Sequence, residues 1–135
     1  TLHALQAKYM PRRFKIRIGT ALWHSVPKIS ALQLRADVLH RQPIGVGEIA
    51  GYHHTPAPFD GTLVIIGAGS AHGIAPNGTL SPFHFARTRM ALLEPPHMHT
   101  SLAVVEASAP VPLVGEWVDV QRPLITTQVD DIEWL

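Results

Sequence analysis

Proline and glycine are spread along the whole chain and leave little room for long helices. The 135 residues include twelve prolines and ten glycines, and both residue types end or weaken helices. The segments between them are short, and most alternate apolar and polar residues with the period of two that is typical of strands. This punctuation predicts a mainly β protein, built as a barrel or a sandwich of short strands.

Four segments carry the strand signal most clearly. They are residues 32–39, 63–66, 102–106 and 116–120. The second and third are continuous apolar runs, which are typical of strands buried on both faces. Only the two ends of the chain, residues 1–9 and 130–135, have a pattern compatible with a helix, and both are short.

Composition excludes several classes of function. The formal net charge is only +1, so no attraction to nucleic acid or to an anionic membrane is expected. The absence of cysteine excludes disulfides and thiolate metal sites. The chain has no run of about 18 apolar residues, so no membrane span is expected. Residues 1–10 lack the charged head and apolar block of a signal peptide, so we expect a cytoplasmic protein.

A shortage of charge points to apolar surface. Charged residues make up 16% of the chain, against about 25% in a typical soluble domain. This shortage is compatible with a face that meets another domain or subunit. The chain also begins at Thr1 rather than Met, so we expect a processed piece or an excised domain.

Two local motifs suggest sites but lack essential parts. If residues 97–99 form a strand, His97 and His99 share one of its faces and supply half of a metal site. His53-His54 or Glu94 would have to complete it from elsewhere, and no metal site is expected. The glycine-rich run 67–73 lacks the spacing and the following helix of a dinucleotide fingerprint, so it predicts a tight turn at a strand end.

Several short motifs gain meaning from their order along the chain. They are Arg17-Ile18-Gly19, the alternating segment 32–39, Gly47-Glu48-Ile49-Ala50-Gly51-Tyr52, the apolar run 63–66 with Gly69-Ser70-Ala71-His72-Gly73, His97-Met98-His99 and Val114-Gly115-Glu116-Trp117-Val118. In this order they resemble the C-terminal part of the alanine racemases, fold-type III enzymes that use pyridoxal 5'-phosphate. The resemblance spans residues 14–120.

The resemblance implies a fold and a division into domains. Residues 1–26 would be the end of an N-terminal (α/β)8 barrel, and residues 27–135 a C-terminal β-barrel domain. The N-terminal barrel would carry pyridoxal phosphate and the lysine that holds it as a Schiff base. That lysine is not in this chain, so the chain alone would be inactive. The whole enzyme would be a homodimer acting on a small amino acid, in amino-acid metabolism.

The resemblance also implies roles for three residues. Arg17 would direct its guanidinium at the pyridine nitrogen of the cofactor and keep that nitrogen unprotonated. Tyr52 would be the second acid/base, opposite the lysine, because racemisation removes a proton from one face of Cα and returns it on the other. In the family this tyrosine reaches the site of the other subunit. The Met98 backbone amide would lie near the substrate carboxylate.

Three positions depart from the family pattern. Ser70 stands where the family has a tyrosine at the site entrance, His99 replaces an aspartate, and Gly51 replaces a serine. These changes leave the substrate amino acid open. Two alternatives also stay open: the C-terminal domain of a related fold-type III amino-acid decarboxylase, whose Cys-Asp pair is absent, and a non-catalytic β-barrel binding module, which Ser70 and His99 favour.

The nine histidines predict a surface charge that depends on pH. Because an exposed imidazole gains a proton near about pH 6.5, we expect the chain to become strongly cationic below that pH. Electrophoretic mobility toward the cathode should therefore increase between about pH 7.5 and about pH 5.5. A mobility that stays flat across this range would contradict the prediction.

Overall fold

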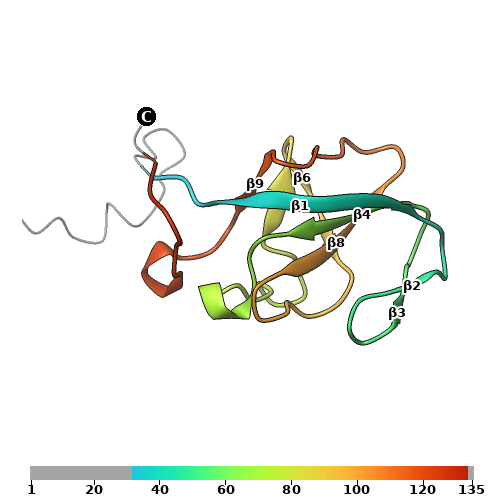
Figure 1. The fold of residues 1–135 in the computed structure, drawn as a ribbon, viewed down its shortest axis with the longest axis horizontal. Coiled ribbons are helices and arrows are strands. Elements are labelled where there is room, and N and C mark those ends of the chain that lie inside the picture. Colours follow the sequence, from blue (N-terminus) through green and yellow to red (C-terminus); the bar gives the residue numbers. More distant parts are fainter. Residues whose placement is uncertain (1–31, 134–135) are drawn as a thin grey trace, which may run out of the picture.

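The computed structural model describes residues 32–133. Arg17, the expected end of an N-terminal barrel at 1–26 and the helix signal at 1–9 lie outside the described residues. The described residues form a mainly β domain in which the long strand β1 spans most of the molecule (Figure 1).

The strands are short apart from β1, as the spacing of proline and glycine predicts. In chain order they are β1 (Arg35–Ile44), β2 (Ile49–Ala50), β3 (Thr55–Pro56), β4 (Gly61–Ile66), β5 (Phe83–Phe85), β6 (Thr88–Arg89), β7 (Ala91–Leu92), β8 (Ser101–Glu106) and β9 (Trp117–Val120). Two short 3-10 helices, η2 (Ser70–His72) and η3 (Leu124–Thr126), complete the elements.

The main sheet curves into a nearly closed barrel. Its seven strands have the order β6-β5-β9-β1-β4-β8-β7, so β6 and β7 lie at its two edges. In the chain only Met90 separates these edge strands. The Met90 N–H donates to the Phe83 carbonyl at 3.0 Å and extends the pairing with β5, while the Leu93 N–H donates to the Leu102 carbonyl at 2.9 Å and extends the pairing with β8. One extended segment therefore joins both edges, which decides for a barrel over a sandwich.

A bulge in β1 allows this strand to take part on both sides. Residues 35–37 pair with β9, and the pairing with β4 begins at Val38. The register shifts between Val38 and His40, which leaves Leu39 as the extra residue. Bulges bend a strand and increase its twist, and this bend helps the sheet to curve.

The barrel encloses the main apolar core. Alternate residues of β4 and β8 point into it, as in any strand with a period of two. The buried members are Ala36, Val38, Val64, Ile66, Ala68, Ile74, Phe83, Met90, Ala103, Val105, Val118 and Val120.

The outer faces of β4 and β8 are also covered. Leu63, Leu102 and Val104 form a second buried cluster with Ile44, Ala57 and Leu93, and Ala50 and Phe59 pack against it. The hairpin of β2 and β3 supplies Ala50 and borders Ala57. This second cluster explains why residues 63–66 and 102–106 are continuous apolar runs, and it anchors the hairpin to the barrel wall.

The strand predictions for the described residues are confirmed. The four predicted strand segments correspond to β1, β4, β8 and β9. The helix signal at the C-terminal end is wrong for residues 130–133, which have no regular structure. Pro123 precedes η3, and only one short turn forms there. Among residues 32–133, no helix is long and apolar enough to cross a membrane.

Phe83 tests the contribution of the barrel core to stability. Its side chain is fully buried, so Phe83→Ala should lower the free energy of unfolding by about 3–5 kcal/mol, through lost burial and the cavity left behind. Ile125→Ala is the control, because Ile125 is 79% exposed and should change stability by less than about 0.5 kcal/mol. Urea unfolding of the two variants measures the difference. Equal effects would contradict the assignment of Phe83 to the core.

Candidate functional site

Tyr52 lies at the tip of the β2–β3 hairpin. Residues 51–54 form the turn between the two strands, and Gly51 and His54 both adopt positive φ angles there. The Tyr52 residue is 81% exposed.

A buried carboxylate holds this turn from below. Glu94 follows β7, and its side chain is only 1% exposed. Its Oε1 accepts the Tyr52 N–H at 2.9 Å, and its Oε2 accepts the His53 N–H at 3.2 Å and the Thr55 hydroxyl at 3.0 Å. The His97 Nε2–H donates to Oε1 as well. Each carboxylate oxygen therefore has two donors.

These donors decide the ionisation state of Glu94. Burial alone would raise the pKa of Glu94, because a charged group loses its hydration. Hydrogen bonds from the His97 and Thr55 side chains and from the His53 and Tyr52 amides act in the opposite direction and stabilise the charged form. The net result is a pKa below the usual value, so Glu94 is ionised at neutral pH.

Gly51 leaves the space that this carboxylate occupies. A Cβ atom at Gly51 would lie 2.4 Å from the Glu94 carboxyl carbon and 2.5 Å from each of its oxygens. The φ angle of +83° at Gly51 is also one that residues with a side chain rarely adopt. Gly51, the departure from the family serine, is therefore matched to Glu94 by direct contact.

Met98 lies in a second turn, beside the first. The His97 N–H donates to the Thr100 carbonyl at 2.9 Å and closes this turn. The carbonyls of His97 and Met98 accept the N–H groups of Ser70 and Ala71 at 2.7 and 2.8 Å, so η2 holds the turn from behind. The Met98 N–H makes no backbone hydrogen bond within residues 32–133.

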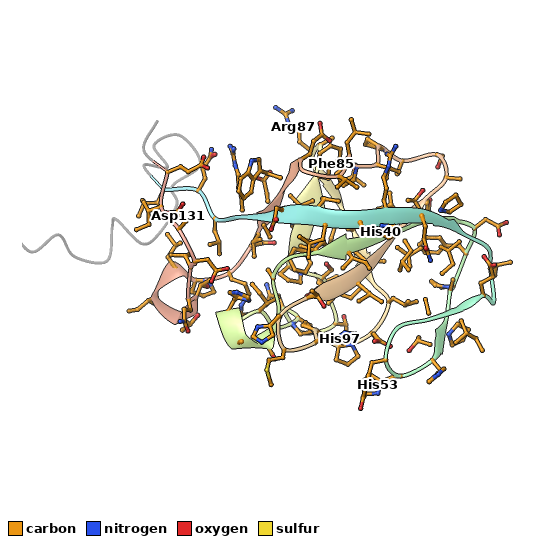
Figure 2. The ribbon with its side chains drawn as sticks, in the orientation of Figure 1. His40, His53, Phe85, Arg87, His97 and Asp131 are labelled. Carbon is orange, nitrogen blue, oxygen red and sulfur yellow. The ribbon has the colours of Figure 1, made fainter. Side chains whose placement is uncertain are left out.

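The two turns meet through aromatic side chains. The ring centroids of Tyr52 and His53 are 5.5 Å apart, and that of His97 lies 6.3 Å from Tyr52 and 6.4 Å from His53, all with edge-to-face geometry. Figure 2 shows His53 and His97 on the hairpin and on the neighbouring turn, near each other. The structure therefore brings together the two elements that carry Tyr52 and Met98.

His97 and His99 do not share a strand face. His97 lies outside regular structure and His99 lies in a bend, so the condition for a shared face is not met. His97 contacts Glu94, whereas the His99 ring lies 6.3 Å from the ring of His72. Within residues 32–133, no group of three or more His, Cys, Asp or Glu side chains is arranged to hold a metal ion.

The structure joins the segments of Tyr52 and Met98 through Glu94, a residue to which the sequence assigned no such role. Tyr52 and Met98 lie at one end of the domain, Ser70 lies exposed on η2 behind Met98, and Arg17 is outside the described residues. Glu94 entered the sequence analysis only as a possible metal ligand. The available signal was a single acidic residue between the apolar residues of β7 and two prolines, which is an unusual place for a charge.

Structure comparison finds the same fold in alanine racemases. The alanine racemase from Bartonella henselae with covalently bound pyridoxal phosphate has a TM-score of 0.59 and 22% identity, over 74% of this chain and 28% of that chain. The biosynthetic alanine racemase from Pseudomonas aeruginosa has a TM-score of 0.53 and 25% identity, over 64% and 25% of the two chains. The alanine racemase of Clostridium difficile 630 in complex with cycloserine has a TM-score of 0.57 and 14% identity, over 70% and 25%.

The match concerns one part of those enzymes. The chain spans about a quarter of the length of the alanine racemases it matches. The described residues have the fold of the C-terminal β domain of an alanine racemase, which confirms the fold that the sequence resemblance implied. No model of a known protein family matches the chain, and no curated protein sequence does.

The lowered pKa of Glu94 predicts a loss of stability in acid. The ionised carboxylate stabilises the fold above about pH 4.5, its usual pKa, and this contribution disappears as the pH falls toward the lower pKa of the folded state. Glu94→Gln should lower the free energy of unfolding at pH 7 by about 2–3 kcal/mol, because hydrogen bonds to a charged acceptor are lost.

The difference between the wild type and Glu94→Gln should narrow as the pH decreases below about 4.5. Urea unfolding at a series of pH values measures it. Glu106→Gln is the matched control, because Glu106 is exposed at the end of β8. A difference between wild type and Glu94→Gln that is independent of pH would contradict the assigned pKa direction.

Proposed function

We propose that this domain, which has the fold of the C-terminal β domain of alanine racemases, serves in a pyridoxal-phosphate-dependent amino-acid racemase. In this proposal the parent enzyme joins it to an N-terminal barrel that holds pyridoxal 5'-phosphate, and two copies form a homodimer. The substrate is a small amino acid, and the enzyme acts in amino-acid metabolism in the cytoplasm.

The observation that carries the proposal is the setting of Tyr52. Its backbone is fixed by a hydrogen bond to a buried carboxylate, while the side chain is 81% exposed. A tyrosine that only packs against the core would bury its ring. A fixed backbone with a free phenol instead suits a group that reaches into a site on another surface.

The described residues fit the substrate side of such a site rather than the cofactor side. All three lysines of the chain, Lys8, Lys15 and Lys28, precede residue 32, so residues 32–133 offer no lysine amine to bind the cofactor. It does offer a phenol and a backbone N–H at neighbouring turns. Bound pyridoxal phosphate would supply the electron sink that makes the Cα–H of an amino acid acidic, and Arg17 would face its pyridine nitrogen.

The residues of the two turns have separate tasks in this proposal. The Tyr52 Oη removes or returns the proton on one face of the substrate Cα, and a lysine of the N-terminal barrel does so on the opposite face. The Met98 N–H donates to the substrate carboxylate, which suits a backbone donor that makes no other backbone hydrogen bond within residues 32–133. The turn held by η2 keeps this donor in place.

The proposal also gives a reason for apolar exposure on the hairpin. Ile49, in strand β2 of the hairpin, is 65% exposed, and Val46, in the turn before β2, is 62% exposed. Large apolar side chains that are exposed together favour contact with another protein surface. A hairpin that carries Tyr52 to the other subunit would cover them there.

Tyr52→Phe in the parent enzyme tests the proposed role. The rate of racemisation of alanine and other small amino acids, measured by chiral chromatography, should decrease by about a hundredfold or more, because one of two acid/base groups is lost. Tyr9→Phe, which changes the other tyrosine of the chain, is the matched control and should retain activity. Full activity of Tyr52→Phe would refute the role. A parent protein without a lysine-bearing barrel would favour the non-catalytic binding module, and release of carbon dioxide would favour the decarboxylase.

A further inference from the structure

We propose that Glu94 is a positioning residue that sets the Tyr52 phenol against the Met98 turn. The inference rests on the proposed function, because it gives Glu94 its task through Tyr52. It concerns a carboxylate with no role in the sequence resemblance, at a position that joins two segments about forty residues apart.

The first argument is the distribution of donors on the carboxylate. Three of its four partners belong to the hairpin turn: the Tyr52 and His53 amides and the Thr55 hydroxyl. The fourth is the His97 ring, next to Met98. A single rigid group therefore connects the turn that carries the proposed acid/base to the turn that carries the proposed carboxylate donor.

The second argument is that the two turns share one atom. Glu94 Oε1 accepts both the Tyr52 N–H and the His97 Nε2–H. The His97 ring in turn lies edge-to-face against the Tyr52 ring, with the centroids 6.3 Å apart. The Tyr52 backbone and the His97 ring, which contacts the Tyr52 ring, are thus both hydrogen-bonded to the same oxygen. This restricts the directions that the Tyr52 phenol can take.

The third argument is the cost of the arrangement. A carboxylate with a side chain 1% exposed loses its hydration, and the fold compensates with four donors. An apolar side chain would fill this space without any need for donors. The observed charge fixes directions as well as distances, because hydrogen bonds to a carboxylate are strong and directional. This is what a positioning group requires.

Gly51 contributes to the same arrangement by leaving space for the Glu94 carboxylate. A Cβ at this position would lie within 2.5 Å of both Glu94 oxygens, so any larger residue displaces the carboxylate. Gly51 and Glu94 should therefore be energetically coupled. Gly51→Ala should lower the midpoint of thermal unfolding more in the wild-type background than in the Glu94→Ala background, where only the strain of a positive φ angle remains. Equal decreases in the two backgrounds would argue against the contact.

The decisive experiment follows each face of the substrate separately. The full parent enzyme is incubated with L-alanine or D-alanine in heavy water, and the uptake of deuterium at Cα is measured by mass spectrometry. In the proposed function, the lysine of the N-terminal barrel exchanges the Cα hydrogen of one enantiomer, and Tyr52 exchanges the Cα hydrogen of the other. Glu94→Gln should slow exchange of the Tyr52 enantiomer by the order of a hundredfold, as for a misplaced catalytic group, and leave exchange of the other enantiomer within about twofold.

Amide hydrogen exchange of the same variants provides a readout that needs no turnover. Peptides that cover residues 49–56 should exchange faster in Glu94→Gln and in Gly51→Ala than in the wild type. Glutamine offers these amides one uncharged acceptor oxygen in place of two charged ones, and a Cβ at Gly51 displaces the carboxylate. Peptides from β4 and β8 should be unchanged, which shows that the barrel is intact. Glu106→Gln should match the wild type in every measurement.

The possible outcomes separate the two proposals. Selective loss of one enantiomer's exchange in both Tyr52→Phe and Glu94→Gln supports the positioning role. Selective loss in Tyr52→Phe alone overturns the role of Glu94 and leaves the function of Tyr52 standing. Equal loss of Cα deuterium uptake for both enantiomers in Glu94→Gln, together with faster amide hydrogen exchange throughout the β-barrel, also overturns the role of Glu94. That result would indicate a general stabilising role instead. Normal exchange of both enantiomers in Tyr52→Phe overturns the proposed function, and with it the task assigned to Glu94.

Discussion

The arrangement of the candidate site depends on the charge of one buried carboxylate. Glu94 is ionised in a place where water does not reach it, and four donors from two turns make that state stable. The free-energy cost of removing the carboxylate from water is similar in size to the free energy gained from its hydrogen bonds. The net contribution of Glu94 to stability is therefore small compared with either quantity. What the arrangement does supply is direction, because the donors must converge on two fixed oxygens.

The barrel provides the frame in which this convergence is possible. The segment 88–92 pairs with β5 on one side and with β8 on the other, and it leads directly to Glu94. Closure therefore places the carboxylate at the rim of the wall formed by β8 and β4. The second apolar cluster packs the β2–β3 hairpin against the same wall. The hairpin turn and the carboxylate meet because both are fixed to that wall by apolar contacts.

Sequence reasoning succeeded where the signal was periodic. The alternation in residues 32–39 and the apolar runs 63–66 and 102–106 correspond to β1, β4 and β8, because burial on one or both faces leaves a direct pattern in the order of residues. The spacing of His97 and His99 puts them on one face only in a strand, and the residues that follow the two prolines form no strand. The sequence gives Glu94 no role except to complete a metal site that it does not predict, whereas this carboxylate accepts four hydrogen bonds from the protein itself.

The sequence by itself determined a mainly β domain and the positions of four of its strands along the chain. Its ordered motifs also resembled the C-terminal domain of alanine racemases, and the fold confirms this resemblance. Those properties depend on local period, on turn residues and on motif order, all of which can be read along one chain. Only the tertiary structure showed that one segment, residues 88–92, pairs with both β5 and β8, and that Tyr52, His97 and Glu94 contact one another. The contact between Tyr52 and Glu94 joins residues 42 positions apart, and no local pattern records which donors a buried carboxylate will find.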